Sequence, residues 1–595
     1  MGGKLPPKLR VSPIPIHGSP RRLAVVQFGS FELDWEAGEL RNNGERVHMQ
    51  EQPFKLLATL LERSGQVVTR EELRAKLWPS DTFVDFDHGL NKAINKLREA
   101  LGDSAEVPRF IETLPKRGYR FVARTEERQT PRGNASIDSI AVFPLSTSLP
   151  DPDLDYLAVG IPGSIIHSLS HIPRLRVIAW NSVARQEENK QDPLAIGRSV
   201  GAKVILVGRI WQRDSKLRLH VDLIDTANGE ALWGEQYDRD LTELFAIHDD
   251  IAREVSARLR VKLTGEDTTR LTKRQTENLE AYQLYVRARR WCEKRSAEGY
   301  RRGIEYLNRA TELDSNFALA HAELAQCISV PCYYGAADPN IAYPKARALA
   351  FRALELDSNL AEAHEVLATT LKNYDWNWEA AEKEYRVTID LNSNYANAHY
   401  HYSYLLAEQG RHSEAIHEIT EALSREPMSP LLNAGLAFVL LHAREWSRCM
   451  EQALTALEVD SNMTLSYWTL GVAYEMTERY PEALEAYRNC ENAGGGLAFS
   501  KAFVAHTYAC SGKIEAARGE LRELYELAKT VYIPNVAFVI AYDGLGEVDR
   551  ALDALESACS RRETNLIDIK NWPHFDAIRH HPRFHAVERR VGLRK

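Results

Sequence analysis

The sequence has 595 residues and a mass of 67.5 kDa, which exceeds one compact domain and predicts several domains or a repeat array with attached domains. Hydrophobic residues make up 44% and charged residues 27%, close to globular averages, and this excludes a chain that is disordered throughout. Because the net charge is -8, a nucleic-acid-binding surface would have to be local.

Residues 1–27 form a proline-rich arm with basic residues and no acidic one. We predict that this arm is disordered and can contact phosphates. It lacks the apolar run of a signal peptide, and no stretch of the sequence has the roughly 18 apolar residues of a membrane span. The sequence therefore predicts no membrane partner.

Residues 28–126 predict a module of short strands and helices. Thr69 and Glu72 have the spacing of a capping box, in which each side chain bonds the backbone N–H group of the other residue at a helix start. Gly65 and Gly102 stand where helices end. The expected elements are strands at 28–34 and 45–49, helices at 52–65, 69–78 and 87–102, and a hairpin at 109–123.

The third helix of this module is amphipathic. Leu90, Ile94, Leu97 and Leu101 recur at helical spacing and form an apolar stripe. The opposite face carries amides and cations, which can hydrogen-bond to base edges and bind phosphates. The candidate nucleic-acid-binding residues are Asn91, Lys92, Asn95, Lys96 and Arg98 in the helix and Lys116, Arg117, Arg120 and Arg124 in the hairpin.

Three segments together, VVTREELRAKLWP, LNKAINKLREALGD and IETLPKRGYRFVA, resemble the winged-helix domain of OmpR/PhoB-type transcriptional regulators. The resemblance implies that Trp78 lies at the turn before the recognition segment, that the candidate residues face double-stranded DNA, and that Gly118 and Tyr119 shape the wing. It also implies binding to tandem half-sites as a homodimer. Asp87, Asn95 and Pro115 depart from the family pattern, so the base sequence read is not transferable.

The module is also similar to that of CadC-like regulators, but a membrane span is missing. Only 27 residues precede it, too few for the phosphorylated receiver domain of response regulators. We therefore expect a regulator that is not switched by its own phosphorylation.

The middle of the chain predicts an α/β domain. The polar stretch at residues 127–136 predicts a linker, and residues 137–264 alternate between strand-like and helix-like runs. AVFPL, LRVIAW, GAKVILVGRI and LFAIHDDIA resemble the TolB-like α/β domain, a resemblance that implies a fold and a domain order but no ligand.

No catalytic set stands out in the sequence. GRSVGAK is too short for a phosphate-binding P-loop, and Ser164 with His167 is best explained as a pair of surface or packing residues on an apolar helix. His574, His580, His581 and His585 suggest a metal site, but a solvated carboxy-terminal cap explains them better. We predict that the protein is not an enzyme and needs no metal or other cofactor.

The second half of the chain repeats with a period of 34 residues. Small residues recur at steps of 43 and 35 and then five steps of 34, and Tyr474, Tyr508 and Tyr542 keep the same period. The small-residue series is Gly303, Ala346, Ala381, Ala415, Cys449, Ala483, Ala517 and Ala551.

Trp468, Leu470, Gly471, Tyr474, Ala483 and Tyr487 resemble the tetratricopeptide (TPR) consensus. This implies an all-α solenoid of about eight units at residues 277–562, with a polar cap at residues 563–595. Its concave face would bind a protein or peptide partner. The candidate groove residues are Asn397, Tyr400, Tyr404, Phe438, Trp468 and Phe499.

All seven cysteines lie in the second half without a metal-ligand spacing, and this favours a reducing, cytoplasmic setting. The leading hypothesis is a sequence-specific transcriptional regulator whose array senses or recruits a protein. The alternative is a TPR scaffold whose winged helix contacts protein instead of DNA.

Overall fold

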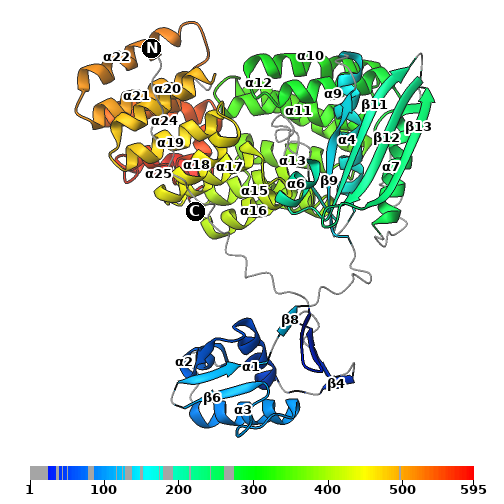
Figure 1. Ribbon diagram of the computed structural model, residues 1–595. Helices are drawn as coiled ribbons and strands as arrows, with labels where there is room; N and C mark the ends of the chain where they lie inside the picture. The colour runs from blue at the N-terminus through cyan, green and yellow to red at the C-terminus, as the bar shows by residue number, and fades with distance from the viewer. Residues whose placement is uncertain are drawn as a thin grey trace, which may run out of the picture. The chain divides into compact units, whose positions relative to one another are not determined.

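The computed structural model (Figure 1) describes the chain as two compact units, residues 1–135 and residues 136–595. The predicted arm up to residue 24 and the predicted linker beyond Glu127 lie outside the described residues. The structure describes residues 25–594 except 35–38, 43–44, 48, 50, 78–85, 116, 124, 128–136, 148–151, 173–174, 179–191, 214–215, 241–242, 260–273 and 495–496.

The described part of the first unit has the predicted α+β composition. One sheet has the strand order β4-β3-β2-β1-β8, and a second has the order β5-β7-β6, in which β6 and β7 form the wing hairpin. The sequence did not predict β1, β3, β5 and β8, because strands of three or four residues show no clear periodicity. The prediction that the disordered arm reaches residue 27 is wrong for residues 25–27, which form β1 and pair with β2. The elements are β1 Val25–Phe28, β2 Phe31–Asp34, β3 Glu39–Asn42, β4 Glu45–Val47, α1 Glu51–Glu62, β5 Val67–Thr69, α2 Arg70–Leu77, α3 Phe86–Leu101, β6 Ile111–Leu114, β7 Gly118–Phe121 and β8 Thr125–Glu127.

The predicted capping box and the predicted helix-ending glycines of this unit are confirmed, although α1 ends at Glu62, before the predicted end at residue 65. The backbone N–H of Thr69 donates to Oε2 of Glu72 at 2.9 Å, and the backbone N–H of Glu72 donates to Oγ1 of Thr69 at 3.2 Å, which completes the capping box. The backbone N–H of Thr69, the guanidinium of Arg63 and the hydroxyl of Thr69 all donate to the Glu72 carboxylate, and these hydrogen bonds lower the pKa of Glu72 to about 2. Gly65 and Gly102 have positive φ angles after α1 and α3, as helix ends require.

The second unit begins with a mixed sheet of order β10-β9-β11-β12-β13. β9 runs parallel to both of its neighbours, whereas β11, β12 and β13 form an antiparallel meander. The apolar sides of α4 and α7 pack on one face of the sheet, and α6 packs on the other. The elements are β9 Ser139–Thr147, α4 Pro152–Ser170, β10 Arg176–Ile178, α6 Pro193–Ser199, β11 Val204–Arg213, β12 Lys216–Asp225, β13 Ala231–Asp240 and α7 Leu244–Arg258.

Residues 279–560 fold into eight consecutive helix pairs, as the period predicts (Figure 1). Every small residue of the 34-residue series lies buried in the second helix of its pair. A Cβ at Gly471 would overlap the ring of Tyr487, so this glycine allows the close approach that the consensus implies.

The first four pairs are α9 Leu279–Cys292 with α10 Ala297–Leu313, α11 Ala318–Tyr333 with α12 Pro339–Leu356, α13 Ala361–Thr370 with α14 Trp378–Leu391, and α15 Ala396–Glu408 with α16 His412–Arg425. A π-helical turn, η2 Leu371–Asp375, extends α13. The last four pairs are α17 Pro430–His442 with α18 Trp446–Val459, α19 Thr464–Met476 with α20 Tyr480–Asn492, α21 Leu497–Cys510 with α22 Ile514–Leu527, and α23 Asn535–Gly544 with α24 Val548–Ser560.

The segment after the last pair is not the solvated polar cap that we expected. It contains η3 Thr564–Asp568, η4 Pro573–Phe575 and α25 Pro582–Val591. Residues 564–569 and 572–575 are buried, and the side chain of His574 is only 1% exposed. The prediction of a solvated histidine cluster is therefore wrong for His574. The apolar residues on either side of it, among them Trp572 and Phe575, pack in the core of the array and bury this segment.

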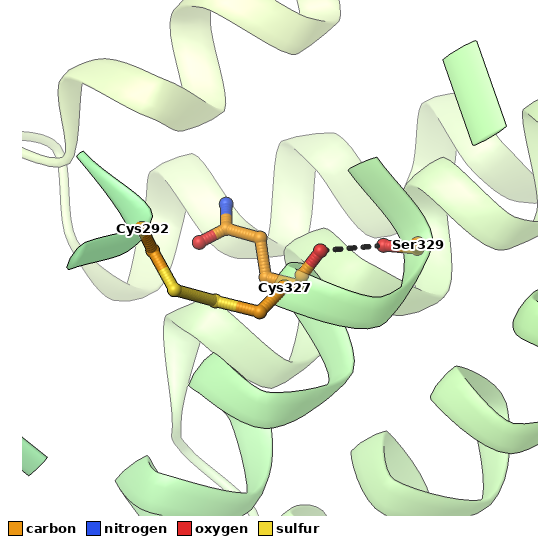
Figure 2. Close-up of a disulfide and its surroundings, with 4 residues drawn as sticks. Cys292, Cys327 and Ser329 are labelled. Atoms are coloured by element: carbon orange, nitrogen blue, oxygen red, sulfur yellow. Dashed lines mark hydrogen bonds between the residues drawn. A yellow bond between two sulfur atoms is a disulfide. The ribbon is translucent and has the colours of Figure 1, made fainter. Parts of the chain in front are cut away.

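Cys292 at the end of α9 and Cys327 in α11 form a disulfide, which Figure 2 shows. The bond joins the first helix pair to the second. Beside it, Oγ of Ser329 donates to the backbone carbonyl of Gln326 at 3.1 Å. This pair runs against the reducing setting that the cysteine spacing favoured, because disulfides are rare in such a setting. The sequence did not predict the pair, since the two residues belong to different repeats and meet only in the fold.

Candidate functional site

The exposed face of α3 is the candidate DNA interface. Asn91, Lys92 and Asn95 are exposed and Lys96 is half-buried, whereas the predicted leucine and isoleucine stripe is buried in the core of the unit. Asn91 and Asn95 are four positions apart, as are Lys92 and Lys96, so each pair lies on one strip of the helix and the two strips are adjacent. The structure thus groups four of the five predicted helix residues into one polar, basic surface.

Asn91 also connects α3 to the wing. Its Oδ1 accepts hydrogen bonds from Nη2 of Arg70 at 3.0 Å and from the hydroxyl of Tyr119 at 3.1 Å. Arg70 begins α2 and Tyr119 lies in β7, so the amide of Asn91 fixes three elements relative to one another. With its oxygen used inside the domain, the amide nitrogen is the group of Asn91 best suited to reach a base acceptor.

Arg98 departs from the predicted DNA-facing role. Its side chain is 7% exposed, and Nη2 donates to the backbone carbonyl of Ile111 at 2.9 Å and to Oγ1 of Thr113 at 2.8 Å. Arg98 is buried because it lies next to the buried Leu97 at the end of α3 that strand β6 of the wing covers. The guanidinium therefore fastens the wing to the helix instead of pointing to DNA.

The wing presents one described basic side chain at its tip. Arg117 is exposed in the turn between β6 and β7. Arg120 instead pairs across the hairpin with Glu112, with Nη2 and Oε2 2.6 Å apart. The other predicted residues of this region, Trp78, Lys116 and Arg124, lie outside the described residues.

The predicted groove residues of the array lie close together, but the chain itself covers part of them. Tyr404 stacks on Phe438, with ring centroids 4.4 Å apart. The ring of Trp572 lies 5.9 Å from that of Phe438 and 5.4 Å from that of Trp468. Tyr400, Tyr404, Phe438 and Phe499 are buried, and Asn397 and Trp468 are half-buried.

Polar contacts also hold the segment around Trp572, residues 564–578, against the array. Nδ2 of Asn571 donates to the backbone carbonyls of Ala407 and Glu408 at 2.9 and 3.0 Å, and Nζ of Lys570 donates to that of Gln409 at 2.7 Å. These carbonyls lie at the end of α15, where helical carbonyls lack partners. Residues 564–578 thus contact the array through both aromatic and polar side chains. The apolar run around Trp572 and Phe575 was the sequence feature from which this docking could have been expected.

A buried charge cluster underlies the same segment. Nζ of Lys372 lies 2.8 Å from Oε1 of Glu408, and both side chains are almost fully buried. Asp568 of η3 completes the cluster and accepts a hydrogen bond from the hydroxyl of Tyr333 at 3.4 Å. Burial raises the pKa of Glu408 to about 7 and also raises that of Asp568, while Lys372 opposes both shifts. Sequence analysis missed this cluster, because its members come from three distant segments.

A cavity of about 440 Å³ lies where α4 of the central domain meets α9, α11, α13 and α15 of the array. Its wall contains apolar and polar side chains and carries charges of both signs. Oε2 of Glu362 is buried there without a hydrogen-bond partner among the described residues, and burial raises the pKa of Glu362 to about 7. The titratable side chains of the wall include His167, Arg289, Arg295, Glu323, Glu362 and Tyr400.

Comparison with known proteins supports the winged helix. Residues 44–121 match the family model "Transcriptional regulatory protein, C terminal". The chain is 36% identical over 96 residues to the "Cholera toxin homolog transcriptional activator" of Vibrio parahaemolyticus, covering 16% of this chain and 32% of the relative. The first unit therefore carries a DNA-binding winged helix of the transcriptional-regulator type.

Two further proteins are each similar to about a third of the chain. "Putative adenylate cyclase 3" of Rhizobium meliloti is 35% identical over 187 residues, covering 31% of this chain and 32% of the relative. The structure of YrrB, named as a TPR protein with an unusual peptide-binding site, is 16% identical with a TM-score of 0.22, covering 31% of this chain and 91% of that one. The chain spans about a third of the length of its Rhizobium and Vibrio relatives.

Proposed function

We propose that the protein is a sequence-specific DNA-binding transcriptional regulator. The observation that carries this proposal is the exposed face of α3, where Asn91, Lys92 and Asn95 stand together on a domain that matches a regulator family. The lysines supply phosphate contacts, and the amides read base edges in the major groove. Arg117 at the tip of the wing contacts the neighbouring backbone, and two copies bind tandem half-sites.

The second unit is proposed to be the regulatory part. Asn394 on the array accepts a hydrogen bond from the backbone N–H of Val177 and donates to the backbone carbonyls of Ser170 and Leu175, so the central domain and the array are bonded together. A partner bound to the array can therefore act on the central domain. The TolB-like character of residues 137–264 remains a prediction from resemblance.

The cavity beside α4 is the proposed entry point for a protein or peptide partner. Residues 564–578 occupy the neighbouring part of the array, including the surroundings of Phe438 and Trp468, whereas the cavity retains open volume with charged walls. Arg295 lines the cavity, and Arg302 on α10 is an exposed arginine outside its lining. Arg295→Glu should abolish partner retention in a pull-down, and Arg302→Glu should not. Equal retention by both variants would refute this entry point.

We place the protein in the cytoplasm and propose no enzymatic activity. Among the described residues, no helix has the length and apolar character needed to cross a membrane. The relative named as a cyclase is matched over only a third of its length, so its activity is not carried over.

The DNA-binding proposal can be tested by titrating labelled duplex DNA with the full-length protein at several salt concentrations. The double variant Lys92→Ala/Lys96→Ala should lower the salt slope by about two, since each phosphate contact contributes about 0.9. Lys55→Ala, a change of the same kind on the exposed side of α1, serves as the control. An unchanged slope in the double variant would contradict docking through α3. Binding of a protein that requires the first unit would instead favour the scaffold hypothesis.

A further inference from the structure

Four side chains with metal-binding atoms meet where α19, α21 and η4 come together. The carboxylate of Glu475, the imidazole of His506 and the thiol of Cys510 each offer one atom, and these atoms all lie within 4.8 Å of one another. Nδ1 of His506 is 2.5 Å from Oε1 of Glu475 and 3.5 Å from Sγ of Cys510. The fourth side chain is His574, whose Nε2 lies 3.2 Å from Oε2 of Glu475.

The local fold explains why these atoms converge. His506 and Cys510 are four residues apart in α21, so their side chains lie on one helix face. Gly544, at the end of α23, has no side chain, and a Cβ there would lie 2.7 Å from Cα of His506. This glycine therefore lets α23 pack closely behind His506.

The close packing places a carboxylate behind the imidazole. Nε2 of His506 lies 3.5 Å from Oδ2 of Asp543, the residue before Gly544. Histidines that bind metals usually donate their other ring N–H to a carboxylate, which fixes the tautomer and directs the free lone pair to the metal. His506 has this arrangement, with Nδ1 directed toward Glu475 and Cys510.

The two buried carboxylates of the cluster also favour binding of a cation. The side chains of Glu475 and Asp543 are 1% and 6% exposed, so two carboxylates are buried near each other. Buried charges require compensation by a partner of opposite sign. A divalent cation bound to one carboxylate and one thiolate would give a neutral first shell, and Tyr487 already donates its hydroxyl to Oε2 of Glu475 at 3.0 Å.

We propose that Glu475, His506 and Cys510 bind one Zn²⁺ ion and that His574 supplies the fourth ligand. Zinc prefers four ligands in a tetrahedron and accepts nitrogen, sulfur and oxygen together, at about 2.0 to 2.3 Å. Zn²⁺ binding requires side-chain movements that bring the ring nitrogen of His574 to the other three atoms, which already lie within 4.8 Å of one another. Because His574 belongs to the segment at 564–578, the ion would fasten this segment to the array.

Cobalt substitution tests the proposal. Metal-stripped, reduced full-length protein is titrated with CoCl₂, and absorption is recorded. We expect one equivalent of Co²⁺ to bind with the visible bands of a tetrahedral site and a thiolate-to-cobalt band in the ultraviolet, and ZnCl₂ to displace it. No such bands at one equivalent, or bands that survive in Cys510→Ser, would overturn the proposal.

Matched variants separate ligation from folding. Cys510 is exposed, so Cys510→Ser should fold and lose the thiolate band, whereas Cys490→Ser, which changes a thiol of the neighbouring helix α20, should keep it. Asp543→Asn should weaken Co²⁺ binding by about 10- to 100-fold, as loss of an outer-shell partner does. Zn²⁺ should slow amide hydrogen exchange at Trp572, His574 and Phe575 in the wild type. The same slowing in His574→Gln would refute the role of His574.

Discussion

Replacement of Trp572 by alanine should release the carboxy-terminal segment from the array. The side chain is 3% exposed, and its ring lies 5.4 to 6.3 Å from those of Trp468, Phe438 and Phe503. Removing a large buried aromatic side chain costs about 3 to 5 kcal/mol. Since about 1.4 kcal/mol corresponds to a tenfold change in an equilibrium constant, the segment should open at least about 100-fold more often.

Hydrogen exchange of the full-length protein measures this opening directly. Amides of residues 566–578 should exchange at least about 100-fold faster in Trp572→Ala. Phe351→Ala is the matched control, because Phe351 is 52% exposed on α12 and its loss leaves no cavity. Exchange at the wild-type rate in Trp572→Ala would show that the segment is held by its polar contacts and that the aromatic cluster adds little.

Three further outcomes follow from the geometry. Gly118→Ala should destabilise the winged helix by about 2 kcal/mol or more, measured by thermal unfolding, because its Cβ would overlap the backbone of β5. Lys372→Met should cost about 3 to 5 kcal/mol in urea unfolding at pH 8, where Glu408, whose pKa is raised to about 7, is ionised and loses its buried cation; the cost should shrink at lower pH, where Glu408 is protonated. The pKa of Glu72 is lowered from 4.5 to about 2 in the fold, so its stabilisation is complete above about pH 4.5 and is lost as the pH falls toward 2. Circular dichroism of Glu72→Gln should show less acid sensitivity over that range; identical acid profiles would contradict this reasoning.

Features that depend on local spacing were predictable from the sequence. The capping box at Thr69, the apolar stripe that ends at Leu101 and the 34-residue series that includes Ala483 all follow from short-range helix geometry, and the structure confirms them. Such patterns are visible because a helix or a repeat imposes its period on neighbouring residues.

Features that depend on distant contacts were not predictable. Arg98 has the spacing of an exposed helix residue, but the wing covers it. Trp572 packs against Trp468 in a groove that the repeat pattern alone predicts to be open. Cys292 forms a disulfide with Cys327, which belongs to another repeat. In each case the deciding partner lies at least 13 residues away in sequence, where periodicity carries no information.

Sequencing of genomic fragments captured by the full-length protein tests the regulatory function most directly. At near-physiological salt we predict that a recurring motif, in tandem copies, is enriched by the wild type and by Lys55→Ala and is lost with Lys92→Ala/Lys96→Ala. Fragments without a common motif, or a motif that the double variant captures equally well, would contradict sequence-specific recognition through α3.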